Sequence, residues 1–269
     1  MEQSLPTSDG ILIPGRRGKI FAHTYLPGGE YPKPVVILCH GIPGNERLFD
    51  FSVFLRERGF CTLNFHYSGS WGSEGTYSIG HCMEDTASVM DYVGRNENGR
   101  FDTNNIFVVG HSLGGLMAAY AIASFPAVRG GAILAPFNVL NDSAPILSGT
   151  GEGLLSSMFS TEREDFWLKG FQREELIAEL RSEPEKYDLV SYAEGLSEKP
   201  VLLVTCRRDS VCVKEKHGGQ LAEAIRSVNA AAPLVYREYD DDHCFNLRRS
   251  EIRQELADFL TVRSADGRS

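Results

Sequence analysis

The chain has 269 residues, a formal net charge of −9, 42% hydrophobic residues and 23% charged residues. This composition is typical of a globular protein and excludes a disordered chain, a coiled coil and a collagen-like chain. Because an acidic protein repels phosphate backbones, we expect no binding to nucleic acid. A chain of this length buries enough surface for a complete core, so its folding needs no supporting disulfides or metals.

We expect a cytoplasmic protein that does not enter a membrane. The sequence contains no run of ~18 apolar residues, the length that a membrane-spanning helix needs. Residues 1–10 (MEQSLPTSDG) lack the basic and apolar regions of a secretory signal. The cysteines form no CxxC pair, which predicts reduced thiols and no metal site. The six are Cys39, Cys61, Cys82, Cys206, Cys212 and Cys244.

Short apolar runs alternate with helix-length segments along the chain. In order, the pattern predicts a strand pair at 11–26 that turns around Pro14-Gly15, a strand at 35–39, a helix at 46–60, a strand at 61–67, a helix at 82–94, a strand at 105–110, a helix at 112–125, strands at 131–135 and 201–205, a helix at 213–227, a strand at 233–239 and a helix at 250–260. This alternation indicates an α/β fold with a mostly parallel central sheet and helices on both faces. Functional residues of such sheets follow the carboxyl ends of the strands.

Residues 137–198 interrupt the alternation, because they contain no convincing strand. They contain an aromatic cluster and a helical stretch at 172–182. We interpret this segment as a small helical cap insertion in a core formed by residues 1–136 and 199–269. The alternative is a surface excursion that packs on the core without covering a site. The aromatic residues are Phe159, Phe166, Trp167 and Phe171.

Ser112 stands in a G-x-S-x-G sequence at residues 110–114, between a predicted strand and a predicted helix. A serine at such a sharp turn is held in a strained backbone conformation with its hydroxyl exposed, and flanking glycines avoid collisions with neighbouring backbone. The pattern predicts that Ser112 is a nucleophile. The alternative is a glycine-rich helix start with a capping serine.

A serine nucleophile needs a base, and at this kind of turn the order along the chain is serine, acid, histidine. Of the seven histidines, His217 and His243 lie far enough downstream. His217 lies in a segment of charged residues, so we expect it on a solvent-exposed helix face. His243 follows the strand at 233–239 and is the predicted base. The alternative is a loop histidine that bonds a neighbouring aspartate.

Asp209 is the predicted acid, because it follows the strand at 201–205 by four residues. Asp240, Asp241 and Asp242 are too close to His243 in sequence to place a carboxylate behind a ring that faces Ser112. We expect these three to raise the local negative potential instead. Asp188 is the alternative acid.

Acyl transfer also needs two N–H donors for the oxyanion. Leu113, directly after Ser112, supplies one, and Ile42 in the loop HGIPG at residues 40–44 supplies the other. Pro43 has no N–H to offer. The alternative for this loop is a plain Gly/Pro turn.

Bulky side chains near these segments are candidates for the walls of an apolar substrate pocket. Aromatic residues at this spacing are as often the core of a cap as the wall of a ligand site. The candidates are Ile42, Trp71, His111, Phe166 and Trp167.

Over residues 18–260 the chain resembles the α/β-hydrolase family. HGIPG is similar to that family's oxyanion loop and GHSLGG (110–115) to its nucleophile turn. KPVLLVTCRRDSV (199–211) is similar to its acid strand and loop, and DHCF (242–245) to its histidine loop. FHYSGSWGSEGTYS (65–78) is similar to another family stretch, with Ser68 in place of an arginine that we take as structural. The resemblance implies no metal and no organic cofactor. It is strongest to small carboxylesterases, feruloyl-type esterases and acylaminoacyl-peptidase-like hydrolases.

These observations predict a serine carboxylic ester hydrolase with Ser112, Asp209 and His243 as catalytic triad. Its partner is a small-molecule ester of feruloyl, cinnamoyl or short-to-medium acyl type. An aminopeptidase, amidase or thioesterase would use the same triad and is the first alternative. A non-catalytic binding protein on a hydrolase scaffold is the second. The sequence does not decide between a monomer and a homo-oligomer.

Overall fold

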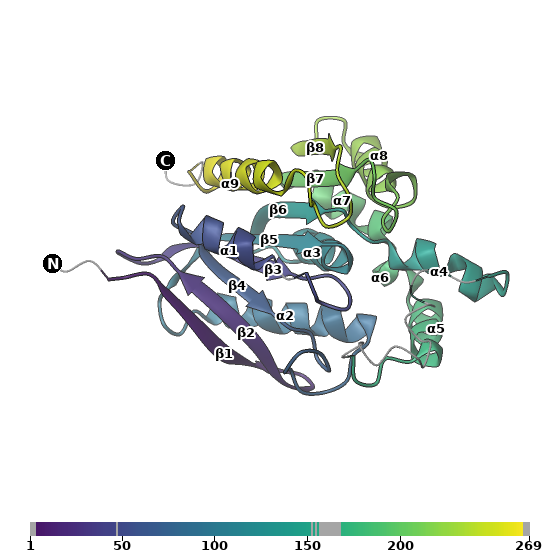
Figure 1. Ribbon diagram of the computed structural model, residues 1–269, viewed down its shortest axis with the longest axis horizontal. Coiled ribbons are helices and arrows are strands. Elements are labelled where there is room, and N and C mark those ends of the chain that lie inside the picture. The colour runs from purple at the N-terminus through teal and green to yellow at the C-terminus, as the bar shows by residue number, and fades with distance from the viewer. Residues whose placement is uncertain (1–3, 47, 152, 154, 156–167, 266–269) are drawn as a thin grey trace.

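The computed structural model describes residues 4–46, 48–151, 153, 155 and 168–265. The strands in this part of the chain form one eight-stranded sheet in the order β1-β2-β4-β3-β5-β6-β7-β8 (Figure 1). β1 and β2, and β2 and β4, pair antiparallel, and the other neighbours pair parallel. The strands are β1 (Thr7–Gly15), β2 (Gly18–Leu26), β3 (Lys33–Cys39), β4 (Cys61–Phe65), β5 (Phe101–His111), β6 (Val128–Leu134), β7 (Val201–Cys206) and β8 (Leu234–Tyr239).

The two kinds of strand differ in sequence because they differ in burial. β4 and β7 are buried at every position, as strands covered by helices on both faces must be. β2 alternates between buried and partly exposed residues, so only one of its faces meets the core. The predicted α/β class with a mostly parallel sheet is confirmed by this topology.

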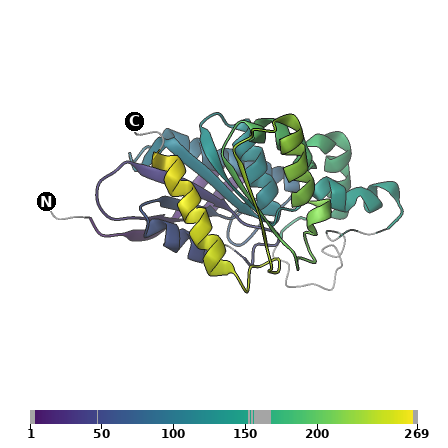
Figure 2. The same cartoon turned by 90° about the horizontal axis from the view of Figure 1, so that it is seen from above.

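Helices cover both faces of the sheet (Figures 1 and 2). α1 and α9 bury Phe51, Leu55 and Ile252 against one face. α2, α3, α7 and α8 cover the other. The helices are α1 (Phe49–Arg56), α2 (Ile79–Arg95), α3 (Leu113–Ser124), α4 (Val139–Ser148), α5 (Arg173–Ser182), α6 (Pro184–Tyr187), α7 (Ala193–Ser197), α8 (Gly218–Val228) and α9 (Arg249–Ala265).

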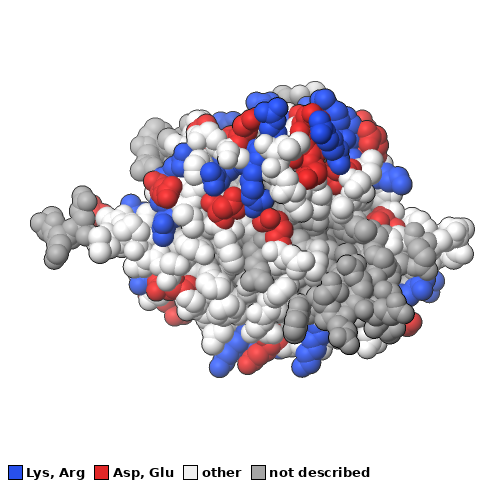
Figure 3. Space-filling model, viewed as in Figure 1, with Lys and Arg blue, Asp and Glu red and all other residues white. Residues whose placement is uncertain are grey.

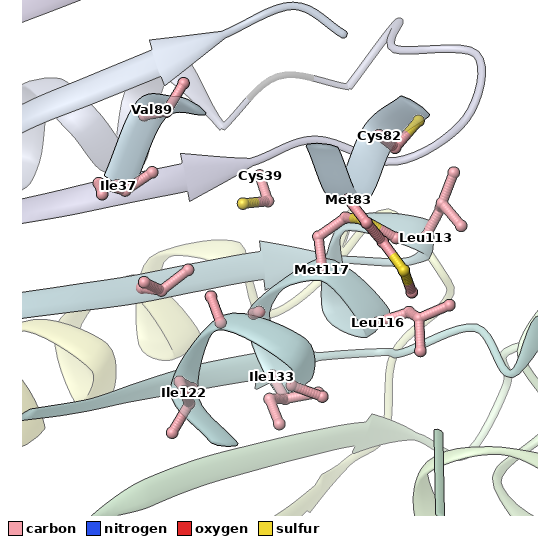
Figure 4. Close-up of a cluster of buried hydrophobic side chains, with 14 of the residues drawn as sticks. Ile37, Cys39, Cys82, Met83, Val89, Leu113, Leu116, Met117, Ile122 and Ile133 are labelled. Atoms are coloured by element: carbon pink, nitrogen blue, oxygen red, sulfur yellow. The ribbon is translucent and has the colours of Figure 1, made fainter. Parts of the chain in front are cut away.

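α3 is the most deeply buried of these helices, because it lies between the sheet and other helices. Leu116 and Met117 of α3 belong to the same buried cluster as Ile37 of β3 and Ile133 of β6 (Figure 4). Its small residues let it pack closely, and an apolar surface all round is typical of such a helix. This packing fixes the position of the residue that precedes α3, which is Ser112.

The turn of the first strand pair lies two residues later than predicted. β1 continues through Pro14, and Gly15 pairs with Gly18, so Arg16 and Arg17 form the turn. Pro14 did not end the strand because β1 lies at the edge of the sheet, where a missing backbone donor is tolerated.

The described part of residues 137–198 is mainly helical. Figure 1 shows α4, α5 and α6 beside one end of the sheet. The short 3₁₀ helix Leu189–Tyr192 and α7 instead pack in the core, where Leu196 is buried and Gly195 approaches Ala123 of α3. A cap over the functional site remains a prediction.

Three observations bear on the predicted location, redox state and charge of the protein. No helix in the described residues has the length and hydropathy to cross a membrane. All six cysteines are free thiols, and five of them are buried. On the face in Figure 3, acidic and basic side chains are interspersed.

Candidate active site

Ser112 lies between the end of β5 and the start of α3, with φ 57° and ψ −122°. A positive φ is strained for a residue with a side chain, and surrounding hydrogen bonds must maintain it. The N–H of Ser112 donates to the carbonyl of Leu134, and its carbonyl accepts from Gly115 and Phe137. The strand-to-helix turn predicted for Ser112 is therefore present.

The glycines around Ser112 are required by close backbone contacts. A Cβ at Gly110 would lie 1.8 Å from the carbonyl oxygen of Gly114, and a Cβ at Gly114 would lie 2.0 Å from that of Cys39. Any side chain at either position would push α3 away from β3 and β5. The sequence pattern thus reflects a steric condition for placing α3 behind Ser112.

Asp209 and His243 form a hydrogen-bonded pair. His243 Nδ1 lies 2.8 Å from Asp209 Oδ2, and the Asp209 side chain is fully buried. Asp209 Oδ1 accepts the N–H groups of Val211 and Cys212 at 2.8 and 2.7 Å. Burial opposes ionisation of Asp209, but the bonds from His243 and these amides outweigh it and lower the pKa of Asp209. The carboxylate is thus ionised and accepts the proton of Nδ1, which leaves Nε2 of a neutral ring as an acceptor.

His111 fixes the loop that carries His243. Its Nε2 donates to the carbonyl of His243 at 2.7 Å, and the two ring centroids are 4.7 Å apart. Burial, followed by the charge of His243, lowers the pKa of His111 to about 3, so this ring stays neutral. His111 is only 2% exposed and supports the loop of the base, and its predicted role as a pocket wall remains a prediction.

Cys212 is a member of this site that sequence reasoning missed. Donor atoms of Asp209, Cys212 and His243 all lie within 4.8 Å of one another. Burial and the nearby Asp209 raise the pKa of the Cys212 thiol well above its ordinary value, and a side-chain hydrogen bond with Ser112 opposes them. The sequence feature that could have revealed Cys212 is its position three residues after Asp209, in the loop whose amides bond the carboxylate.

Three loops therefore converge on one point at the carboxyl edge of the sheet. Ser112 follows β5, Asp209 and Cys212 follow β7, and His243 follows β8. The Ser112 side chain is close enough to act on the pKa of the Cys212 thiol, and the ring of His243 bonds Asp209. Within the described residues no hydrogen bond joins the side chains of Ser112 and His243 directly.

The loop at residues 40–44 lies against Ser112, as expected of an oxyanion loop. A Cβ at Gly41 would lie 2.9 Å from Cβ of Ser112. Among the described residues, the N–H groups of Ile42 and Leu113 have no hydrogen-bond acceptor. Two unused donors at the start of α3 and in the adjacent loop are what an oxyanion requires.

Trp71 braces this loop from the side. Its Nε1 donates to the carbonyl of Pro43 at 2.6 Å, and a Cβ at Gly44 would meet the same nitrogen at 2.7 Å. The indole is partly exposed, so a role as pocket wall remains open to test. Phe166 and Trp167, the other predicted wall residues, lie outside the described residues.

His217 is not on a solvent-exposed helix face, and that prediction was wrong. α8 begins at Gly218, so His217 precedes the helix, and the residue is 3% exposed. Its Nδ1 accepts the N–H of Asn138 at 2.9 Å, and its ring stacks on Phe137. Burial lowers the pKa of His217 to about 4. The charged neighbours suggested an exposed helix from residue 213, whereas the α-helix begins only after His217.

The other aspartates that were considered have structural roles. Asp188, the alternative acid, bonds Asn138 and the N–H of Val190. Asp240 pairs with Arg208. Asp241 is fully buried and accepts the N–H groups of Asp242, Leu247 and Arg248, and Asp242 accepts those of Cys244 and Asn246. Asp241 and Asp242 therefore shape the His243 loop, a role beyond the predicted effect on the local potential.

Ser68, which stands in place of the arginine that the family resemblance predicts, is buried and bonded. Its N–H and its hydroxyl donate to the two oxygens of Asp85, at 2.5 and 2.9 Å. Burial raises the pKa of Asp85, and these bonds oppose the effect. A short side chain on this loop thus docks it on α2, away from the Asp209–His243 pair.

The model of the alpha/beta hydrolase family matches residues 36–259 of the chain. Among curated proteins, an uncharacterised 31.7 kDa protein of the traX-finO intergenic region of Escherichia coli is 36% identical over 95 residues. That match covers 34% of this chain and 32% of the relative, so the chain spans about a third of the length of the curated relatives it matches.

Several solved structures share the fold at low sequence identity. The esterase Pf2001 of Pyrococcus furiosus has a TM-score of 0.69 and 17% identity, over 95% of this chain and 92% of that one. Est1E of Butyrivibrio proteoclasticus with bound ferulic acid has a TM-score of 0.71 and 20% identity, over 95% and 99%. An acylaminoacyl peptidase of Pyrococcus horikoshii has a TM-score of 0.70 and 14% identity, over 96% and 41%.

Proposed function

The chain belongs to the alpha/beta hydrolase family, and from this premise we propose that it is a serine hydrolase that cleaves carboxylic esters. The observation that carries the proposal is the buried Asp209–His243 pair beside the strained turn of Ser112. A neutral imidazole whose Nδ1 proton is held by a carboxylate is the base that a serine hydroxyl needs.

In the first step Ser112 attacks the acyl carbon of the ester. Its hydroxyl turns toward Nε2 of His243 by rotation about one side-chain bond. Catalytic hydrogen bonds of this kind are often long or unformed until substrate is bound. His243 takes the proton of Ser112, and the ionised Asp209 stabilises the imidazolium that results.

The tetrahedral intermediate places a negative charge on the former carbonyl oxygen. The N–H groups of Ile42 and Leu113 bind it, and the positive end of α3 points at the same place. His243 then donates its proton to the leaving alcohol. Water, activated by the same imidazole, attacks the acyl-enzyme and releases the acid.

An ester is favoured over other acyl substrates by the similar structures. Two of the three named above are called esterases or bind ferulic acid, which supports a feruloyl, cinnamoyl or short-to-medium acyl group. The similarity to a peptidase keeps amide cleavage as the alternative. A thioesterase would use the same residues. A non-catalytic binding role is disfavoured because Ser112, Asp209 and His243 are all present.

The remaining features of the proposal follow from the sequence. The proposed reaction uses only side chains and backbone amides of this chain, and water is the second reactant. The partner is a small-molecule ester and not a nucleic acid or a membrane. A cytoplasmic location, and the choice between monomer and homo-oligomer, stay predictions.

A substrate panel tests the proposal. Purified protein is incubated with p-nitrophenyl esters of increasing acyl length, hydroxycinnamoyl esters, a thioester and aminoacyl-p-nitroanilides, with Ser112→Ala as the control. We expect turnover of esters above the anilides and the thioester, and covalent labelling of Ser112 by a fluorophosphonate probe. Faster turnover of anilides would favour the amidase, and turnover that persists in the alanine variant would remove the proposed mechanism.

A further inference from the structure

The Cys212 thiol has no part in ester hydrolysis as proposed, yet it lies among the groups that perform it. Its sulfur, a carboxylate oxygen of Asp209 and a ring nitrogen of His243 are mutually within 4.8 Å. Thiolate, imidazole and carboxylate are together the donor set of zinc sites in proteins. Within the described residues this is the one such group of three.

The spacing of these donors is close to that of a bound ion. Tetrahedral Zn²⁺ with bonds of ~2.3 Å to sulfur and ~2.0–2.2 Å to nitrogen or oxygen sets its donors roughly 3.3–3.6 Å apart. The Asp209–His243 contact is 2.8 Å. The carboxylate and the ring need to separate by about half an ångström, and the sulfur to approach by about an ångström, which side-chain rotation supplies.

The charges around the cluster favour a cation. The charged groups that act on the Cys212 thiol are the carboxylates of Asp209 and Asp142. The cations Arg249 and Lys216 act on the neighbouring rings of His111 and His217, respectively, and are not among the charges that act on the thiol. Transferring an ion to this partly buried place is therefore compensated by opposite charge.

We propose that Cys212, His243 and Asp209 form a site for a thiophilic divalent cation, Zn²⁺, and that its occupation inhibits the ester hydrolysis proposed above. The ion binds Cys212 as thiolate, and the thiol proton leaves to water. Water fills the fourth position of the ion, as in open zinc sites. This inhibition rests on the proposed function, whereas binding of the ion does not.

Inhibition follows whichever ring nitrogen binds the ion. If Nε2 binds, the lone pair that would take the Ser112 proton is used. If Nδ1 binds, the proton of the neutral ring moves to Nε2, which then cannot accept another. In both cases Asp209 is drawn to the metal, and His243 no longer acts as base.

Direct binding is measured first, so that it does not depend on activity. Metal-free protein competes with a chromophoric zinc indicator, and Co²⁺ is added separately to detect thiolate-to-cobalt absorption. We expect one site per chain, and a loss of more than about tenfold in affinity for Cys212→Ser and Cys212→Ala, since even an outer partner of a metal contributes about 10–100-fold. Cys244→Ser is the matched control, because Cys244 adjoins His243 and is outside the cluster.

The rate of ester hydrolysis is then titrated with Zn²⁺, with each variant compared with its own metal-free rate. We expect inhibition of wild type and Cys244→Ser, reversed by a chelator, and resistance in both Cys212 variants. No saturable binding, or equal binding in the Cys212 variants, overturns the site. Binding without inhibition of an active enzyme overturns the inhibitory role, and binding by a protein that cleaves no ester leaves the site in place while the proposed function falls.

Discussion

The triad loops and the helical segment α5–α6 are held on the same sheet in different ways. In the triad loops, carboxylates are saturated by backbone amides, as Asp209 and Asp241 show. α5 buries Leu176 and Leu180 in the core, and its Glu179 accepts from the Ser78 hydroxyl at 2.5 Å and the Gly80 N–H at 3.3 Å at the start of α2. Backbone amides fix a carboxylate within its own loop, whereas the apolar contacts and the Glu179 side chain of α5 tolerate small shifts of the helix. Substitutions in the loops should therefore abolish chemistry, and those at α5 should change stability modestly.

The largest expected effect is that of Ser112→Ala. Without the nucleophile, kcat falls by roughly 10⁶. The free energy of unfolding changes little, because the strained backbone and its three hydrogen bonds do not involve the hydroxyl. Steady-state kinetics on the best ester and denaturant unfolding measure the two quantities. A variant with undiminished kcat would show that the turn serves another purpose.

Asp209→Asn should have the next largest effect. The asparagine side chain carries no negative charge, so it does not stabilise the imidazolium of His243 or fix its Nδ1 proton. We therefore expect kcat to fall by roughly 10⁴. Asp188→Asn is the matched control, because that carboxylate bonds Asn138 and Val190 in the described structure. We expect its kcat to stay within a few-fold of wild type. Larger losses for Asp188→Asn than for Asp209→Asn would reverse the assignment of the acid.

The buried His217 predicts how stability depends on pH. Its folded pKa of about 4 lies below the ordinary unfolded value of ~6.5. Between these values the unfolded chain binds a proton that the folded protein does not. The free energy of unfolding contributed by His217 is therefore fully present above pH ~6.5 and is lost as the pH falls through this window, by on the order of 3 kcal/mol.

Urea unfolding between pH 4.5 and 7.5 measures this dependence for wild type and His217→Asn. The asparagine oxygen can accept the Asn138 N–H and does not titrate, so we expect a shallower decline in the variant. The same decline in both proteins would mean that other groups account for the acid sensitivity.

The smallest expected effect belongs to Glu179→Gln. The amide keeps an acceptor for Ser78 but removes the negative charge at the N-terminus of α2, which is worth about 0.3–1 kcal/mol. Glu223→Gln, at an exposed position within α8 and outside its first turn, is the control and should be nearly neutral. Thermal melts measure both, and kcat on a short ester should be unchanged. A large loss of kcat would show that α5 takes part in placing the triad.

Much of the site could be read from the sequence because its conditions are local. The glycines near Ser112 are needed because the backbone of this turn touches β3 and the start of α3. They therefore lie within three residues of Ser112. Asp209 and His243 follow apolar strands directly, and parallel strands bring their carboxyl ends to the same edge. The unused N–H groups of Ile42 and Leu113 lie in the segments that directly follow β3 and β5, which the sequence also indicates. The family match over residues 36–259 agrees with this order of motifs.

By itself the sequence determined the alternation of strands and helices, the mostly parallel sheet and the order of the proposed nucleophile, acid and base. Only the tertiary structure decided that His217 is buried on Phe137, that Asp241 holds the His243 loop, and that the Cys212 thiol lies beside Asp209 and His243. The physical reason is that periodicity reports which face of one element avoids water. Contacts between loops depend instead on how distant segments fold over the edge of the sheet, and no local pattern encodes that.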